Sequence, residues 1–302
     1  MLSALSSVIK RTSRFLGYTT AEQARQGNQH MFRIEQNQSL GARTFRLLEL
    51  IYHATVRNIR KGHGGSAIMG LVMHLIQSIL MVLIFLFVFQ LMGRGVAAIR
   101  GDLLVYIMSG IFMFMTHVKA IGAVSGADGP TSAMMKHAPM NPIISIVAAA
   151  LGVLYLQILA ALIILFFYDA AFAPVSIDEP FQTFGMFILS WATGVGIGMI
   201  LLSAKPWAPG VVGLISTLFQ RANMIASGKM FVANTLKPKM LALFDWNPLF
   251  HTIDQGRGFI FLNYAPRYTN YLYPIKVLAV CILIGLMLEF VTRKYASSSW
   301  NT

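Results

Sequence analysis

The polar residues best placed to do chemistry lie in residues 246–257, with the sequence Trp-Asn-Pro-Leu-Phe-His-Thr-Ile-Asp-Gln-Gly-Arg. The Asn-Pro pair breaks the chain, and the short helix expected over residues 250–261 puts His251, Asp254 and Arg257 one turn apart on one side. An aromatic belt at a membrane surface explains the rings crowded here, and so does a passage whose rings stack on sugars. The aromatic residues are Phe244, Trp246, Phe250, Phe259, Phe261, Tyr264, Tyr268, Tyr271 and Tyr273.

Arg221 is a second candidate, because it interrupts the apolar run of residues 210–226. An arginine inside a membrane span is costly unless it faces water, a partner charge or a pore. It can also reach the nearer membrane surface with its long side chain. The sequence leaves both interpretations open.

The sequence does not contain the motifs for phosphate, dinucleotide or metal binding, or for enzyme catalysis. Gly228-Lys229 is followed by Met230 and has no upstream glycine, so it is not a phosphate-binding loop. Gly194, Gly196 and Gly198 lie in an apolar segment without a preceding strand, which favours close helix packing over dinucleotide binding. No His, Asp and Glu residues have metal-ligand spacing within one element, and the paired acids or positioned nucleophile of an enzyme are not found.

The composition predicts an all-α membrane protein. The chain is 56% hydrophobic and 12% charged, with a mean hydropathy of +0.64, whereas soluble domains carry about 25% charged residues. The net charge of +13 is spread between apolar runs rather than gathered on a polar domain, so anionic lipids are a better partner than nucleic acid. Cys281 is the single cysteine, which excludes a disulfide framework.

Six membrane-spanning helices are expected, because each run approaches the roughly 20 apolar residues that cross a bilayer. A re-entrant or interfacial helical hairpin is expected in the mixed, externally located region between the fifth and sixth spans, because polar backbone at membrane depth must be buried or line water. The six runs are 67–91, 103–118, 143–167, 181–202, 210–226 and 273–290.

Residues 43–60 predict an amphipathic helix in the membrane interface, with apolar residues at steps of three and four and arginines on another face. A solvated helix packed on a partner is the alternative. Residues 1–42 form a polar extension before the main domain, 43–302. Its Ser, Thr and basic residues resemble a transit peptide, but a cytoplasmic tail is the preferred interpretation.

Basic residues predict that both termini are cytoplasmic. Residues 1–66 hold ten Lys and Arg residues, and the N-terminal segment usually dominates insertion. One observation opposes this orientation: residues 229–276 would lie outside with six basic residues.

Four stretches together resemble the type-2 ABC exporter permeases, specifically those for capsular polysaccharide and lipid-linked O-antigen. They are the basic helix at 43–60, the segment Thr131 to Ile143, Arg221 with Ser227-Gly228, and Trp246 to Arg257. The last stretch carries most of the resemblance, although Asp254 stands where the family more often has glutamate. The resemblance covers about residues 43–294.

The resemblance implies a homodimer in a bacterial plasma membrane, joined to a separate cytoplasmic ATPase that binds ATP and Mg²⁺. No cofactor is expected in this chain, and periplasmic or outer-membrane export proteins are further expected partners. The implied residues are Met134, Met135, Lys136, His137, Ala138 and Pro139 for coupling to the ATPase, Arg43, Arg46, Arg57 and Arg60 for a gate helix, and Arg221, Ser227, Trp246, Asn247, His251, Asp254 and Arg257 for the substrate path.

Three other functions remain open at this stage. The same machinery could move a drug, lipid or peptide. A membrane-embedded transferase acting on lipid carriers is a second alternative, and a passive scaffold is a third.

Overall fold

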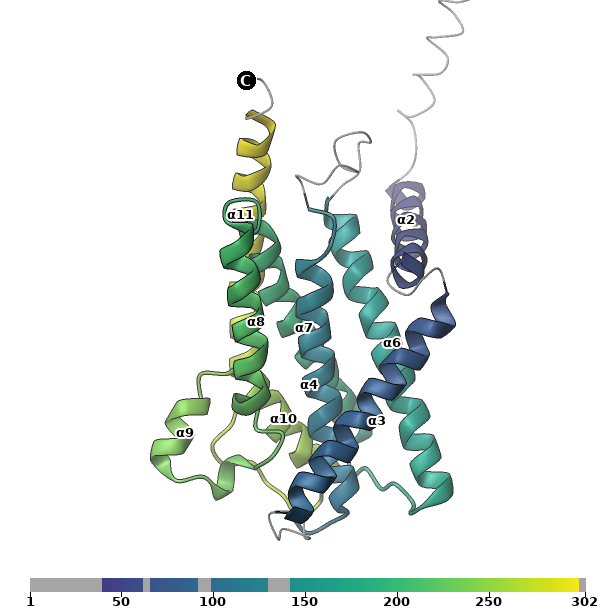
Figure 1. Cartoon of the computed structure of the whole chain (residues 1–302), viewed down its shortest axis with the longest axis vertical. Coiled ribbons are helices and arrows are strands. Elements are labelled where there is room, and N and C mark those ends of the chain that lie inside the picture. The colour runs from purple at the N-terminus through teal and green to yellow at the C-terminus, as the bar shows by residue number, and fades with distance from the viewer. Residues whose placement is uncertain (1–39, 62–65, 92–98, 130–141, 299–302) are drawn as a thin grey trace, which may run out of the picture. The chain divides into compact units, whose positions relative to one another are not determined.

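The computed structural model describes residues 40–61, 66–91, 99–129 and 142–298. These residues form nine α-helices and one short 3-10 helix (Figure 1). The chain divides into two compact units, residues 1–50 and 51–302. The elements are α2 (Leu40–Lys61), α3 (Ala67–Leu91), α4 (Leu103–Ser125), α6 (Pro142–Ala171), α7 (Pro180–Ala204), α8 (Pro209–Ala226), η1 (Ala233–Thr235), α9 (Pro238–Phe244), α10 (Pro248–Ile260) and α11 (Leu272–Ser298).

Five of these helices, α3, α4, α6, α7 and α11, are long and apolar enough to cross a membrane. Helix α3 has the bounds that the sequence predicts for the first span, residues 67–91. The predicted fifth span forms a helix, α8, but this 18-residue helix is not among the five. Its last turns contain Gln220, Arg221 and Asn223, which lower its hydropathy. A crossing by α8, and with it the six-span layout, therefore stays a prediction.

The second span is longer than predicted. Lys119 was expected to begin a polar loop, but α4 continues to Ser125. The Lys119 ammonium donates a hydrogen bond to Oε1 of Gln77 in α3. Because the lysine has a hydrogen-bond partner in the neighbouring helix, it can lie between α3 and α4.

Helix α7 is the central element of the second unit, because it packs along both α4 and α11 (Figure 1). Its glycines permit the close approach. A Cβ atom on Gly194 would lie 2.5 Å from the carbonyl oxygen of His117 in α4, and one on Gly196 would lie 3.0 Å from Cβ of Cys281 in α11. Gly198 also faces α4, where its Cβ would lie 2.8 Å from that of Val124. The predicted packing role of these glycines is confirmed.

The largest core cluster lies where α3, α4, α6 and α7 meet, close to the end at which α4 begins. Buried members include Phe89, Tyr106, Ile111 and Phe187. Helix α10 completes this core with Leu249 and Ile253, which are almost fully buried. A segment outside the five apolar helices is thus part of the core.

The predicted amphipathic helix is present as α2, which is four residues longer than expected. Its apolar residues include Phe45, Leu48 and Tyr52, and all three are exposed. In the second unit, Thr55 and Ile59 approach Gly152 of α6, where an added Cβ would lie 3.3 Å from the Ile59 side chain.

Candidate functional site

The predicted stretch 246–257 folds into α10, a short helix whose start is fixed by Asn247. The Asn247 side chain accepts a hydrogen bond from the amide of Leu249 at 3.0 Å and so caps the helix. Its amide nitrogen donates to Oδ1 of Asn223 at 2.8 Å and to the carbonyl of Ala226 at 3.0 Å. Asn247 therefore joins the start of α10 to the end of α8.

Arg257 is completely buried and holds the chain that follows α8. One guanidinium nitrogen, Nη1, donates to the carbonyls of Gly228 at 2.8 Å and Phe231 at 2.7 Å. The other, Nη2, donates to the carbonyl of Lys229 at 2.5 Å. The guanidinium also lies 4.0 Å from the ring centre of Tyr106 in α4, a cation–π distance.

Gly228 makes this arrangement possible. Its φ is +72°, a backbone conformation that residues other than glycine rarely adopt. An added Cβ would also lie 2.5 Å from the ring of Phe250. The tight turn at Gly228 directs the carbonyls of Gly228, Lys229 and Phe231 toward the one guanidinium.

Asp254 binds two further segments. Its Oδ1 accepts hydrogen bonds from the Ala233 amide at 3.0 Å and the Tyr264 hydroxyl at 2.6 Å, and its Oδ2 accepts one from Thr269 at 2.8 Å. Burial, and then the negative charge of Asp254, raise the pKa of Tyr264 well above its usual value. Tyr264 therefore stays a neutral hydrogen-bond donor.

His251 is fixed in one tautomer by its two neighbours. Its Nδ1 accepts a hydrogen bond from the amide of Asn270 at 3.0 Å, so the proton is on Nε2. Nε2 then donates to the carbonyl of Asp245 at 2.7 Å. The ring also lies 4.7 Å from that of Tyr273, measured between centres.

His251, Asp254 and Arg257 lie together on α10, as their spacing predicts, and Asn247 caps its start. Their hydrogen-bonding atoms are largely used within the chain: each side chain ties α10 to a different stretch of residues 223–270. Groups satisfied in this way are poorly available for proton transfer. The arrangement acts chemically as a brace for the polar connection between α8 and α11.

Ser227, Trp246 and Arg221 do not join this hydrogen-bonded cluster. Ser227 is fully buried, and its hydroxyl has no hydrogen-bond partner among the described residues. Trp246 is 54% exposed and donates only to the Leu243 carbonyl, at 2.7 Å. Arg221 is exposed on α8.

The remaining predicted residues belong to other segments of the sequence. Arg46, Arg57 and Arg60 are exposed on α2, and Arg43 lies in the same helix. The coupling residues Met134, Met135, Lys136, His137, Ala138 and Pro139 lie outside the described residues.

Lys229 is a buried residue that the sequence analysis considered only as part of a phosphate loop. It is 2% exposed, and Nζ has no hydrogen-bond partner among the described residues. Nζ lies 3.5 Å from the ring centre of Phe114 and 4.9 Å from that of Phe85. Burial lowers the pKa of Lys229 to about 7. In the sequence, only the neighbouring glycine, Gly228, hints that the backbone turns sharply beside this lysine.

His117 is a second residue that the sequence analysis missed. It is completely buried in α4, and its Nδ1 lies 2.9 Å from the carbonyl oxygen of Ser190 and 3.1 Å from Oγ1 of Thr193. The hydroxyl of Ser190 in turn donates to Thr252 of α10 at 2.8 Å. These contacts link α4, α7 and α10 through polar groups inside the helical layer.

Two further observations bear on identity. Among the described residues there is no group of three His, Cys, Asp or Glu side chains that could hold a metal ion. Comparison of the chain with known protein families and with curated proteins finds no match.

Replacing Arg257 with Gln is expected to destabilise the protein by about 3 kcal/mol or more, because three buried carbonyls lose a charged donor. Thermal unfolding of the purified protein in detergent measures the change, and limited proteolysis should cut near residues 228–236 first. Arg267→Gln is the matched control, because Arg267 is exposed. Equal melting temperatures for the two variants would contradict the bracing role.

Lys229→Met is expected to raise the melting temperature at pH 7 by about 5 °C or more, because a buried amine without a hydrogen-bond partner among the described residues is replaced by an apolar side chain of similar length. The wild-type lysine is protonated below about pH 10.5 when unfolded but only below about pH 7 when folded. Wild-type stability should therefore rise between pH 7 and 10 and stay flat, with respect to this group, below pH 7.

Melting temperatures at pH 6, 7, 8 and 9 test this expectation. Lys239→Met, at an exposed position of α9, controls for the loss of one positive charge. The Lys229→Met variant should lose the part of the pH dependence that Lys239→Met keeps. A stability profile identical to that of the control would show that Lys229 is not desolvated.

Proposed function

We propose that this chain is the membrane-spanning permease subunit of an ATP-driven exporter, working as a homodimer with a separate ATPase that binds ATP and Mg²⁺. Its proposed cargo is a polysaccharide or lipid-linked glycan, carried outward across a bacterial plasma membrane. The proposal rests on the sequence resemblance together with the arrangement of α8 and α10. Permeases for a drug, lipid or peptide are the alternative class of cargo.

The depth of α10 supports a re-entrant hairpin. Thr252 of α10 accepts a hydrogen bond from Ser190 of α7. Ser190 lies about 15 Å along α7 from Pro180, at 1.5 Å per residue, and half of a hydrocarbon layer is about 15 Å thick. If α7 crosses the membrane, the first turn of α10 is near the bilayer midplane. The described brace would then supply the hydrogen bonds that lipid cannot.

The exposed face of α8 is the observation that carries the proposal of a passage. Helix α8 has few neighbours, and only Val212 and Asn223 are buried in it. Arg221 lies on the same helical stripe as Leu214, Leu218 and Ile225, all of which are exposed. An arginine within an unpartnered apolar stripe needs a partner surface or a water-filled path.

A second copy of the chain is the proposed partner of this stripe. Two copies meeting near α8 would cover its apolar residues and place two Arg221 side chains beside one passage. Exposed Trp246, close in sequence to the start of α10, would line the passage, where its ring can stack on a sugar. The buried cluster of α10 would give this part of the passage a fixed shape.

The coupling of ATP hydrolysis to export is assigned to parts away from the brace. Residues 134–139 would dock on the cytoplasmic ATPase, and the arginines of α2 would follow its movement at the membrane surface. The orientation proposed is that with both termini cytoplasmic and six crossings, α8 being the fifth. Residues 229–271 then form a re-entrant segment that opens to the outer side, where periplasmic or outer-membrane export proteins could contact it.

Cysteine cross-linking tests the position of α8. Leu218→Cys in a Cys281→Ser background should form disulfide-linked dimers in membranes, because Leu218 lies on the proposed contact stripe. Leu162→Cys in the same background is the control, since Leu162 is equally exposed but lies on α6. Dimers formed equally by both variants, or by neither, would contradict an α8 interface.

Arg221→Ala and Trp246→Ala are expected to reduce export at least tenfold while leaving dimer formation and melting temperature nearly unchanged, because both side chains are exposed. Cell-surface glycan measured in a strain that lacks the chromosomal copy provides the readout. Normal export by both variants would remove these residues from the substrate path.

Replacing residues 134–139 with a Gly-Ser segment of equal length tests energy coupling. An ATPase subunit that co-purifies with the wild-type protein should be lost from the variant, whereas the dimer should remain. Retention of the ATPase by the variant would contradict the coupling assignment. Full transport activity by the purified chain alone would overturn the proposed function itself.

A further inference from the structure

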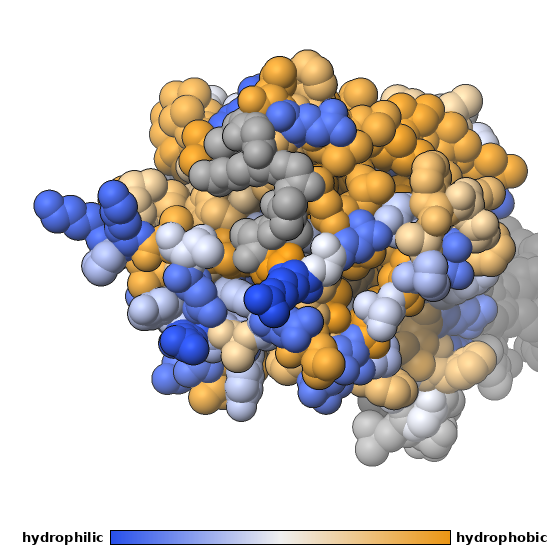
Figure 2. Space-filling view, turned by 90° about the horizontal axis from the view of Figure 1, so that it is seen from below, coloured by the Kyte–Doolittle hydropathy of each residue, from blue (hydrophilic) through white to orange (hydrophobic). Residues whose placement is uncertain are grey.

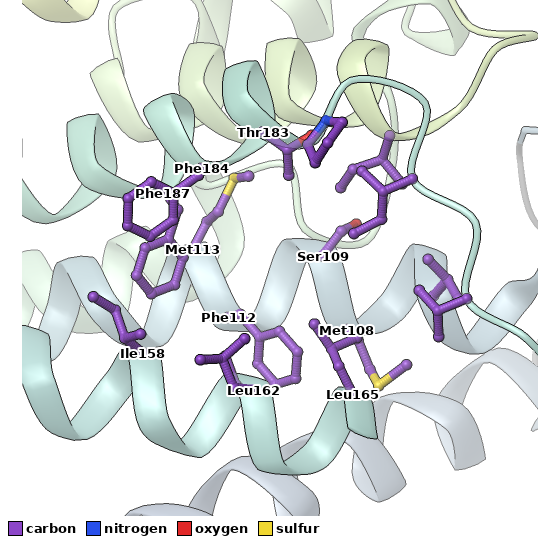
Figure 3. A pocket seen from close by; sticks show the side chains of 16 residues that line it. Met108, Ser109, Phe112, Met113, Ile158, Leu162, Leu165, Thr183, Phe184 and Phe187 are labelled. Atoms are coloured by element: carbon purple, nitrogen blue, oxygen red, sulfur yellow. The ribbon is translucent and has the colours of Figure 1, made fainter. Parts of the chain in front are cut away.

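Two adjoining pockets lie at the end of the second unit where α4 and α7 begin. The first has a volume of about 230 Å³ and is bounded by α4, α6 and α7 (Figure 3). Figure 3 shows the side chains of Met108, Phe112, Ile158, Leu162 and Phe187 around it. Its lining is almost entirely apolar, and Leu162 and Phe184 are more than half exposed, so the pocket reaches the outer face of the helices. Such a space fits a hydrocarbon chain.

The second pocket is polar and has a volume of about 370 Å³. It shares Val105 and Ile260 with the first, so the two spaces meet at these residues. Its charged lining consists of Arg100, Asp102 and Asp178. Figure 2 shows this end of the molecule, where hydrophilic residues gather beside apolar ones. An apolar space therefore continues into a charged one, as the two parts of an amphiphile require.

The charged side chains of the polar pocket differ in the number of hydrogen bonds that they form within the chain. Asp102 caps α4 by accepting from the Leu104 amide at 2.7 Å, and it also accepts from the Tyr168 hydroxyl. Within the described part of the chain, neither the Asp178 carboxylate nor the Arg100 guanidinium forms a hydrogen bond. One cation and one anion of the lining therefore have no described partner and can bind a ligand, beside a second carboxylate.

We propose that the two pockets form a binding site for a phospholipid with a phosphoethanolamine head group. One acyl chain occupies the apolar pocket. The phosphate binds Arg100, and the primary ammonium binds Asp178 with Asp102 behind it. The site does not depend on the proposed transport function, because it requires only that α4, α6 and α7 are in a membrane.

The charges select this head group over the other common ones. A phosphoglycerol head group carries a phosphate but no cation, so it would leave Asp102 and Asp178 facing a like charge. A phosphocholine head group has a cation, but its trimethylammonium cannot donate the N–H hydrogen bonds that carboxylates accept. A primary ammonium supplies both charge and donors, which makes the stronger contact.

Native mass spectrometry of the purified full-length protein tests the proposal. The protein is stripped of lipid in detergent and then offered equal amounts of phosphatidylethanolamine, phosphatidylcholine and phosphatidylglycerol with identical acyl chains. We expect one phosphatidylethanolamine per chain to be retained, about tenfold more often than either competitor, which corresponds to about 1.4 kcal/mol.

Variants separate the two halves of the site. Asp178→Asn should abolish the preference for phosphatidylethanolamine over phosphatidylcholine, and Arg100→Gln should weaken retention of all three lipids. Arg267→Gln, at an exposed arginine outside both pockets, should change nothing. Ala161→Leu should fill the apolar pocket and reduce retention of every lipid, whereas Ala170→Leu, at an exposed position of the same helix, should not.

Equal retention of the three lipids would overturn the proposal and indicate an ordinary lipid annulus. Preferential retention of phosphatidylglycerol would show that the charges of the polar pocket were assigned wrongly. Unchanged retention by Ala161→Leu, with a melting temperature equal to that of Ala170→Leu, would exclude the apolar pocket as the site of the chain. Failure of the transport tests would leave all these outcomes unaffected.

Discussion

The polar connection between α8 and α11 depends on the hydrogen bonds that the buried guanidinium of Arg257 donates. The chain leaving α8 must turn back before it can enter α10, and the turn at Gly228 leaves carbonyls pointing inward without helical partners. Three of them are satisfied by Arg257. Unpaired carbonyls inside a helical layer each carry a large desolvation cost. These three hydrogen bonds fix the turn after α8 against α10.

The same constraint explains the composition of residues 223–270. Asn247, Asp254 and His251 each bind a backbone group that no regular secondary structure satisfies. These side chains are shielded from solvent, so their hydrogen bonds hold loops in place rather than presenting reactive groups. Residues that look catalytic by type can thus be needed because an irregular backbone must be buried.

The long helices were largely predictable, because runs of apolar residues set their positions directly. The end of α4 was predicted wrongly, since the sequence cannot show that Gln77 of α3 lies beside Lys119. In the site, the steps of three from His251 to Arg257 predicted one shared helix. The partners of those side chains lie up to 29 residues away along the chain, so the bracing role could not be predicted. The burial of Lys229 also arises only from folding.

The glycines of α7 have a mechanical consequence. Two of them seat the helix on α4 and a third seats it on α11, with backbone and Cβ atoms in near contact on opposite sides. Turning α7 about its own axis would bring bulky side chains into those contacts, so rotation or sliding of this helix is strongly opposed. Helices α4, α7 and α11 should therefore move as one rigid block. Helix α8, which has few neighbours to restrain it, could be displaced without disturbing this block.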